Sequence, residues 1–445
     1  MNPVRTTALG LLIGGAASCH AYDLGPLSLD GFAKQEWTRS THAAKATEPC
    51  YGDSRGVLGF PGCGASTEDV ATRSAWTSMV QLDGKLKYEF DSGTTVGASL
   101  SRRWRQWKED IVGQPWLAKG VWVDDPTWGR LDAGTMLSRA WSRQDGFSYP
   151  IGLSTQWSET GAGFSVLKKA LRYGTPMMGL GDGKLHAEVT LATNDRFHSP
   201  WNPEYDANAP KPRLTELFLQ YSDDSNLIEL VYDDARGAGM ASWGKNPLVG
   251  AANLPVQTSP AVFGNANRQK MVVLEGQHWF TPQWELTWGL RSSYWSGSAL
   301  TCDYAEKYNG CVWQGGFNIS PLTLQPGNTI YPGYGARTRD WMLGLSRVDG
   351  VWTTSVGVVH LGQAKTDNPT QWGQSNSAYS AKLNLSRKVP ELYPDLNVYG
   401  GLGFTHFDRL GPAPISAPSN TAFDGVDSRL NREAVSVTLG TVLVF

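Results

Sequence analysis

Hydrophobic and polar residues alternate along the last segment of the chain, residues 434–445. Val435 and Leu439 fall on one side of an extended backbone, whereas the small residues Ser436 and Gly440 fall on the other. A period of two with many β-branched residues predicts a strand with one apolar face. The chain ends within this strand, so we expect the strand to close a membrane barrel, where pairing on both sides leaves no open edge. A buried terminal strand of a soluble sandwich is the alternative.

The same alternation is sharper in a hairpin predicted from Trp76–Phe90 and Thr94–Trp107, joined by a tight turn at residues 91–93. One face is apolar and consists of Val80, Leu82, Leu86, Tyr88, Phe90, Val96, Ala98 and Leu100. The other face is polar and consists of Gln81, Asp83, Lys85, Lys87, Glu89, Gly97, Ser99, Ser101, Arg103 and Arg105. A soluble core would take the apolar face inside. Charges at successive positions of the polar face indicate a water-filled lumen instead.

Sixteen alternating segments follow this pattern along the chain. They are Leu27–Trp37, Trp76–Phe90, Thr94–Trp107, Trp116–Val123, Trp128–Gly134, Ser165–Gly174, Lys184–Thr193, Arg213–Ser222, Leu227–Asp234, Lys270–Phe280, Trp284–Trp295, Arg339–Val348, Val351–Leu361, Ser377–Val389, Leu396–Phe407 and the segment from Arg432. Short turns alternate with long connections at roughly 39–73, 135–164, 194–212, 235–268, 297–338 and 408–431. Outer-membrane barrels have this asymmetry, with short periplasmic turns and long external loops. Aromatic residues gather at the segment ends, where interfacial girdles lie.

Residues 1–21 have the form of a signal peptide. Arg5 precedes an apolar run that is too short to span a bilayer as a helix, and small residues lead to a cleavage site after Ala21. A lipoprotein processed at Cys19 is the alternative. We therefore expect a removed leader, 1–21, and one outer-membrane β-barrel domain, 22–445.

Charge and cysteine content narrow the class of protein further. The formal net charge is only −2, which argues against nucleic acid as a partner. The mean hydropathy of −0.33 does not exclude a membrane, because a barrel alternates its hydrophobicity. Two close cysteine pairs, Cys50/Cys63 and Cys302/Cys311, predict two local disulfides in an exported protein. Zinc is the competing interpretation, but neither a CxxC motif nor a histidine cluster supports it. We expect no metal and no cofactor.

In its organisation into strands, short turns and long loops, the chain resembles the general porins of Gram-negative outer membranes. Trp128-Gly-Arg-Leu-Asp-Ala-Gly134 is similar to the strand that precedes the family's constriction loop. Leu171-Arg-Tyr-Gly-Thr-Pro176 is similar to the strand that follows it, and Phe445 resembles the family's terminal assembly signal. The resemblance implies an all-β, transmembrane, antiparallel barrel of sixteen strands that forms a homotrimer. It also implies that the third external loop folds into the pore.

The expected pore loop departs from the acidic loops of cation-preferring porins. Its charges, Arg139, Arg143, Asp145 and Glu159, balance to zero, and Trp141, Phe147, Tyr149 and Trp157 make it aromatic. Opposite it, a basic wall is expected from Lys34, Lys85, Lys87, Arg103, Arg105, Arg172, Arg291 and Lys382. Opposing lumen acids are Asp30, Glu36, Asp83, Glu89, Glu188, Glu229 and Glu285. Any one of these charges can simply be solvated, and we expect only two or three of the basic residues at the narrowest point.

The sequence therefore predicts a passive outer-membrane channel for small hydrophilic solutes and ions, in contact with membrane lipid and lipopolysaccharide. A channel selective for small carboxylates or aromatic acids is the alternative. A barrel enzyme is the interpretation from another class, but the histidines are scattered and neither Gly-x-Ser-x-Gly nor His-Glu-x-x-His occurs. A plugged importer and a soluble exported binding protein are more distant options.

Overall fold

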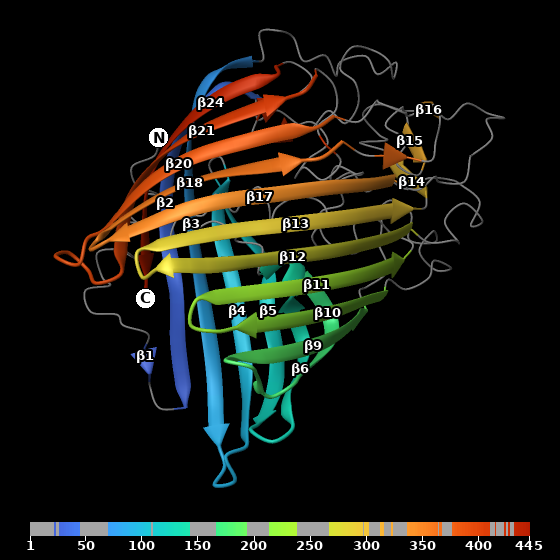
Figure 1. Cartoon of the computed structure of the whole chain (residues 1–445), viewed down its shortest axis with the longest axis vertical. Coiled ribbons are helices and arrows are strands. Elements are labelled where there is room, and N and C mark those ends of the chain that lie inside the picture. The colour runs from blue at the N-terminus through green and yellow to red at the C-terminus, as the bar shows by residue number, and fades with distance from the viewer. Residues whose placement is uncertain are drawn as a thin grey trace.

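The chain forms a closed antiparallel β-barrel in the computed structural model (Figure 1). Strands β9 to β13 and β17 to β21 cross in front of β2 to β5 in this view. The structure describes residues 22–23, 26–44, 70–107, 110–142, 166–193, 213–237, 267–296, 298–301, 312–315, 322–323, 336–363, 365–366, 376–409, 414, 422–423, 426–427 and 431–445.

Sixteen long strands build the wall, which confirms the predicted strand number. They are β2 (Leu27–Ala44), β3 (Val70–Glu89), β4 (Thr95–Trp107), β5 (Asp110–Asp125), β6 (Gly129–Leu137), β7 (Val166–Gly174), β9 (Gly183–Thr193), β10 (Arg213–Ser222), β11 (Asn226–Gly237), β12 (Asn267–Thr281), β13 (Trp284–Ser296), β17 (Ala336–Asp349), β18 (Trp352–Leu361), β20 (Ala378–Lys388), β21 (Leu396–Phe407) and β24 (Glu433–Val444).

Short elements accompany the wall. They are β1 (Tyr22–Asp23), β8 (Met178–Leu180), β14 (Ser298–Thr301), β15 (Val312–Gly315), β16 (Leu322–Thr323), β19 (Lys365–Thr366), β22 (Ala422–Phe423), β23 (Val426–Asp427) and the helical turn α2 (Arg139–Ser142). Strands β14 to β16 form a separate small sheet. None of the described helices has the length and apolar character to span a membrane.

The barrel closes where β24 pairs antiparallel with β2, from Phe32 opposite Val444 to Ser40 opposite Ser436. The last residue takes part, since the Phe445 N–H donates to the Gly31 carbonyl at 3.0 Å and the Gly31 N–H donates back at 2.8 Å. Every other wall strand pairs with its neighbours along the chain. The predicted role of the terminal strand in closing the barrel is confirmed.

Several strands on the side of the long connections extend further than the alternation predicted. Strand β2 continues to Ala44 and β3 begins at Val70, so residues expected in a long loop are strand. Strand β5 likewise begins at Asp110. These strand ends do not alternate between hydrophobic and polar residues, so the pattern alone could not extend the predicted strands over them.

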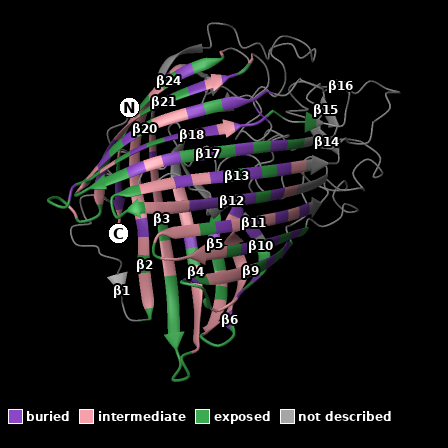
Figure 2. Ribbon diagram, in the orientation of Figure 1, coloured by how far each residue is buried: buried purple, intermediate pink, exposed green. Residues whose placement is uncertain are grey.

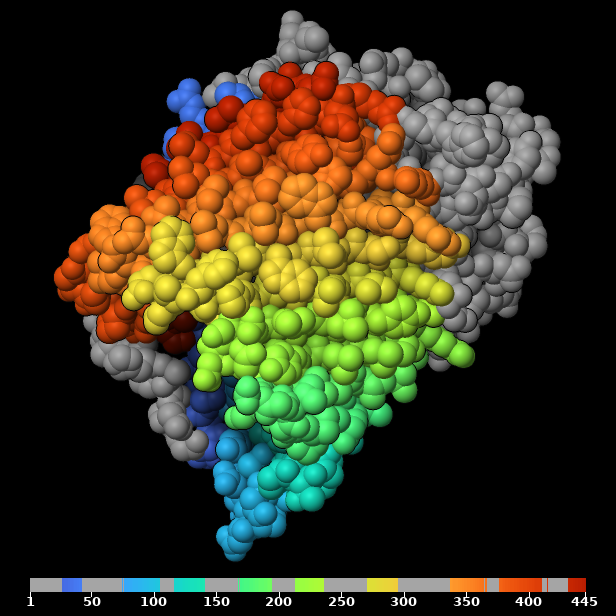
Figure 3. All heavy atoms as spheres, viewed as in Figure 1, coloured from blue at the N-terminus to red at the C-terminus, as the bar shows by residue number. Residues whose placement is uncertain are grey.

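Inward and outward faces separate clearly along the wall. Outward side chains such as Leu82, Leu219, Leu290 and Leu439 are exposed, whereas inward residues such as Phe218 and Arg291 are buried. Figure 2 shows buried and exposed positions alternating along the strands, and Figure 3 shows the continuous outer surface of β9 to β21. An apolar exterior of this extent is suited to hydrocarbon rather than water.

Candidate functional site

Three neighbouring strands bring the most buried polar side chains together on the inner wall. Arg172 on β7 lies opposite Thr190 on β9, which lies opposite Glu216 on β10. Arg172 Nη2 donates to Glu216 Oε1 at 2.9 Å, and Arg172 Nε donates to Thr190 Oγ1 at 2.8 Å. Glu216 is 1% exposed. Since a buried charge is tolerated only when it is paired and hydrogen-bonded, this row is a structural ion pair of the wall.

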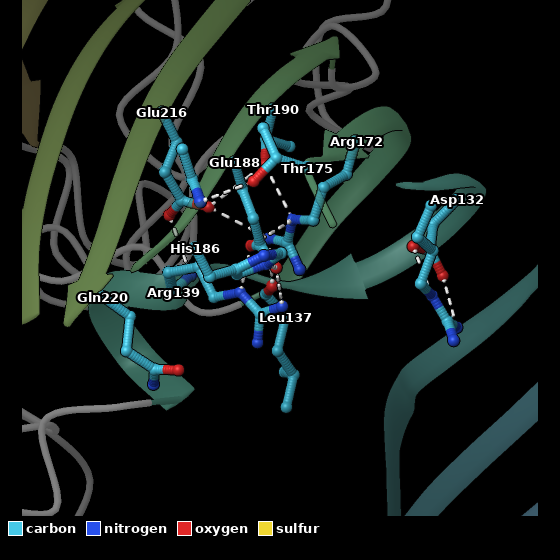
Figure 4. A network of polar contacts seen from close by, with 12 residues as sticks. Asp132, Leu137, Arg139, Arg172, Thr175, His186, Glu188, Thr190, Glu216 and Gln220 are labelled. Carbon is cyan, nitrogen blue, oxygen red and sulfur yellow. Dashed lines mark hydrogen bonds and ion pairs between the residues drawn. The ribbon is translucent and has the colours of Figure 1, made fainter. Parts of the chain in front are cut away.

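The beginning of the expected third external loop, the connection at roughly 135–164, is tied to this row (Figure 4). Glu216 Oε2 accepts hydrogen bonds from Ser138 Oγ at 2.7 Å and from the Arg139 N–H at 2.8 Å, at the start of α2. The Arg139 guanidinium forms a two-pronged ion pair with Glu188 on β9. Arg172 Nη2 also donates to the Leu137 carbonyl at 2.9 Å. Residues 137–139 are therefore held against the inner wall by two carboxylates and one arginine.

A second buried ion pair lies further around the wall, beyond β11 and β12. Arg291 on β13 is opposite Asp340 on β17, and Arg291 Nη2 lies 2.8 Å from Asp340 Oδ2. Neither side chain is exposed, and Asp340 also accepts from the Gly362 N–H. Arg172 and Arg291 lie on the inward face as predicted. Both are buried and paired with carboxylates, Arg172 with Glu216 and Arg291 with Asp340.

Lys34, Lys85 and Lys87, which were expected in the basic wall, each form an ion pair with a different carboxylate. Lys85 Nζ lies 3.3 Å from Asp30, Lys87 Nζ lies 3.2 Å from Glu89, and Lys34 Nζ lies 2.9 Å from Glu36. More than half of the Lys85 and Lys87 side chains is exposed, toward the short turn after β3. Solvated pairs of this kind leave little net charge at one point.

Arg103 lies further along β4, away from that turn. Gln81 Oε1 accepts from Arg103 Nε at 2.9 Å and from Nη2 at 2.7 Å, and Gln81 Nε2 donates to Asp83 at 2.8 Å. The guanidinium also lies 5.5 Å from the centre of the Phe32 ring on β2. This fixed geometry holds Arg103 on the inner face of the wall.

Several of the predicted site residues lie outside the description. They are Arg143, Asp145, Glu159, the aromatic residues Phe147, Tyr149 and Trp157, the side chains of Arg105 and Trp141, and the cysteines Cys50, Cys63, Cys302 and Cys311. Their roles stay predictions.

Some residues of the inner network were not predicted from sequence. Four such residues are buried: Ser138, Glu216 and Asp233 belong to the row around Arg172 or lie beside it, whereas Asp340 pairs with Arg291. Glu216 escaped notice because its strand has apolar residues on both faces, with Leu214 inside and Leu217 outside. The feature that could have identified Glu216 is its position on the inward face of the strand, where a carboxylate stands among apolar residues.

The outer surface carries an aromatic girdle at the short-turn ends, as predicted. Tyr88, Phe90, Phe280, Trp284 and Trp352 are exposed there. Tyr88 and Phe90 meet edge to face with ring centres 4.9 Å apart. Aromatic side chains at this level match the interface of a bilayer.

Histidines with described side chains lie on separate strands. His186 bonds Glu188 inside the barrel, whereas His278 bonds Asn226, and His360 and His406 lie on outward phases. Within the described ranges, no three His, Cys, Asp or Glu side chains form a metal-binding group.

Solved structures share this architecture although their sequences are distant. The anion-selective porin from Comamonas acidovorans matches with a TM-score of 0.54 and 11% identity, over 94% of this chain and 99% of that one. The outer membrane channel DcaP of Acinetobacter baumannii matches with a TM-score of 0.53 and 12% identity, over 94% and 97%. OmpT, an outer membrane protein of Vibrio cholerae, matches with a TM-score of 0.51 and 9% identity, over 96% and 100%. No protein-family model and no curated protein sequence matches the chain. The chain has the sixteen-stranded barrel fold of bacterial outer-membrane porins.

Proposed function

We propose that the protein is a passive diffusion channel for small hydrophilic solutes and ions in the bacterial outer membrane. The observation that carries the proposal is the division of the wall, with exposed Leu and aromatic side chains outside and ion-paired Lys, Arg, Asp and Glu inside. A closed barrel with a polar interior gives water a path that a lipid bilayer does not.

The third external loop, the connection at roughly 135–164, is proposed to narrow this path. Its first residues are fixed at Glu216 and Glu188, so the chain that follows Ser142 starts from a point on the inner wall. Residues 143–165 folding across the lumen would leave a passage between the loop and the wall of β2 to β4, where Lys34 and Arg103 lie. We place the constriction there and expect weak anion preference or near-neutral selectivity.

Planar-bilayer recording tests the channel itself. The purified protein should add stepwise conductance increments and should make liposomes permeable to small sugars but not to large dextrans. Well-folded, membrane-inserted protein that adds neither conductance nor sugar permeability would contradict the proposal.

A channel selective for small carboxylates or aromatic acids is the second candidate. It is motivated by cations held over aromatic rings on inward positions, with Arg130 4.3 Å from the Trp122 ring centre and Arg103 5.5 Å from Phe32. Such pairs can receive a planar anion by charge and stacking. Benzoate should then reduce single-channel current at concentrations at which cyclohexanol does not, and equal effects of the two would remove this candidate.

The partners and processing predicted from sequence belong to the same proposal. A leader of residues 1–21, local disulfides Cys50–Cys63 and Cys302–Cys311, contact with lipid and lipopolysaccharide, and a homotrimer are all expected of it. The OmpT barrel of Vibrio cholerae with a TM-score of 0.51 is described in a trimer form.

A further inference from the structure

Outward side chains at the long-connection ends of β12, β13 and β17 form a row across neighbouring strands (Figure 1). Lys270 on β12 lies directly opposite Tyr294 on β13, which lies opposite Arg337 on β17. Arg337 in turn lies opposite Lys365 on β19. Directly opposite residues of antiparallel strands share one face of the sheet, so three cations stand beside one another on the outer surface. The row ends at Asp234 on β11, opposite Lys270.

The row lies at the outer edge of the apolar band. Tyr294 has the same outward phase as the exposed Leu290 and follows the girdle residue Trp284 by ten residues on the same strand. Ten residues likewise separate Lys270 from the girdle residue Phe280 on β12. Ten residues of a strand tilted by about 40° rise by about 26 Å, and the apolar band of such a barrel is about 25 Å tall. The row therefore reaches the level of the lipid headgroups on the side of the long connections.

A fourth cation and a hydroxyl group adjoin the row on the side of the apolar band. Arg339 on β17 lies opposite Ser292 on β13, and both are exposed. Arg337 is exposed as well, and its guanidinium carbon lies 5.3 Å from the centre of the Tyr294 ring. Guanidinium and hydroxyl groups are hydrogen-bond donors, so this patch offers donors and positive charge to the edge of the membrane.

The cations of the row differ from those at the opposite edge of the wall. At the short-turn ends, the outward Arg347 pairs with Asp349 at 3.0 Å and Arg387 pairs with Glu391 at 2.6 Å. Within the part of the chain that the structure describes, no carboxylate forms a salt bridge with any of the four cations at the long-connection end. Like charges directly opposite each other, as in the pair of β17 and β19, are unfavourable. An anion bound between them would turn this repulsion into attraction.

We propose that this row binds the phosphate group of a lipid in the outer leaflet directly, without a bridging divalent cation. Phosphate is the matching anion because guanidinium groups such as those of Arg337 and Arg339 donate two parallel hydrogen bonds to it. A bridging Mg²⁺ or Ca²⁺ ion would need carboxylates from the wall, whereas the carboxylate of the described row, Asp234, lies at its end beyond Lys270. Lipopolysaccharide is the phosphate-bearing lipid expected as a partner. The site rests on the proposed outer-membrane location of the barrel, but not on its conductance.

Lipid retained through purification tests the site. The double variant Arg337→Gln with Arg339→Gln removes two cations of the row, and Arg347→Gln with Arg387→Gln is the matched control at the short-turn ends. After extraction in mild detergent and washing with EDTA, native mass spectrometry counts the lipopolysaccharide molecules bound to each barrel. Wild type and control should retain equal amounts, whereas the first variant should retain about tenfold less, since cations near an anionic membrane surface each add to binding. Equal retention in all three proteins, or loss of the lipid from the wild type during the EDTA wash, would overturn the proposal.

Titration with defined lipids identifies the group that is bound. Detergent-solubilised, delipidated protein should bind phosphorylated lipid A about tenfold more tightly than dephosphorylated lipid A, and the difference should vanish in Arg337→Gln with Arg339→Gln. Equal affinity for dephosphorylated lipid A would show recognition of acyl chains, and equal affinity for phosphatidylglycerol would show attraction to any anionic surface; either result would overturn the site. Conductance of this variant should be unchanged because both arginines face away from the lumen. A wild type that binds phosphorylated lipid A but does not conduct would contradict the channel and support the lipid site.

Discussion

Tyr399 on β21 and Glu36 on β2 join across the strand that lies between them. Tyr399 Oη donates a hydrogen bond to Glu36 Oε2 at 2.7 Å, and its ring passes over Gly440 of β24. The absence of a side chain at Gly440 makes this bridge possible. Glu36 also pairs with Lys34, so one carboxylate connects the inner wall on both sides of the barrel closure.

Gly440→Ala should therefore destabilise the closure. An added Cβ would lie 2.4 Å from Tyr399 Cζ and 2.9 Å from the Gln35 carbonyl oxygen, so the tyrosine must move and its bond to Glu36 lengthens. We expect a loss of about 1–3 kcal/mol, as for other overpacked sites. The urea midpoint of the folded barrel measures it. Gly400→Ala is the control, since the nearest atom there is the flexible Leu439 Cδ2 at 3.2 Å. Equal midpoints for the two variants would contradict the argument.

Arg172→Gln should destabilise the inner wall far more than removal of an exposed arginine. The substitution leaves Glu216 buried beside Asp233, its neighbour across β10 and β11, without the arginine that pairs with it. Breaking a buried pair costs about 3–5 kcal/mol. Arg387→Gln, which removes an exposed pair with Glu391, should cost no more than about 1 kcal/mol. Urea midpoints compare the two. Single-channel current should also become noisier in Arg172→Gln, because Leu137 loses its hydrogen bond.

Replacement of Arg103 and Arg105 with Gln should move the reversal potential in a salt gradient toward cations. Arg103 is held on the inner face by its hydrogen bonds to Gln81, whereas Lys85 and Lys87 lie toward the short turn after β3 with more than half of each side chain exposed. The difference should shrink at 1 M salt, where the Debye length is only about 3 Å. Lys85→Gln with Lys87→Gln is the control and should shift the potential less. A strongly cation-selective wild type would show that these arginines do not set the selectivity.

Deletion of Phe445 should reduce the amount of heat-modifiable barrel in the outer membrane. The deletion removes both backbone hydrogen bonds to Gly31 as well as the terminal ring. Phe445→Ala keeps the backbone bonds and removes only the ring, so a defect shared by both variants assigns the effect to the aromatic signal. Normal levels of inserted protein in the deletion variant would refute a role in assembly.

The turn between β10 and β11 should contribute a stability that depends on pH. Backbone N–H groups of Ser225 and Asn226 donate to Asp223 Oδ1 at 2.8 Å and hold the pKa of that carboxyl below its usual range. Because the folded pKa is below the unfolded value of about 3.9, the contribution is complete above that value and is lost as pH falls through the folded pKa. In Asp223→Asn the urea midpoint should therefore change less between pH 6 and pH 3 than in the wild type. An identical pH dependence of the urea midpoint in both proteins would exclude the turn as a source of pH-dependent stability.

The barrel itself was predictable from the printed sequence because both of its signals are local. Alternation at Val80, Leu82 and Leu86 marks a lipid-facing strand, and the short turn at residues 91–93 marks a hairpin. The pairing of charges was not predictable in the same way. The partner of Arg172 depends on which residues of β9 and β10 lie opposite it, and alternation determines the face of a residue but not its register along the neighbour. The strand ends escaped prediction because residues such as those of 38–44 do not alternate.

The closure of β24 on β2 has a consequence for how the chain reaches this state. Thr38 and Thr438 touch across that seam with 400 positions between them, whereas the other wall strands pair with neighbours close in sequence. Hairpins can form early with a small loss of chain entropy. Pairing β24 with β2 joins the most distant segments of the chain, so it carries a larger entropy loss and is expected to come last. Until then the sheet has two long unpaired edges, each a template for aggregation. The pairing of β24 with β2 is therefore the step that removes the last aggregation-prone edges of the sheet.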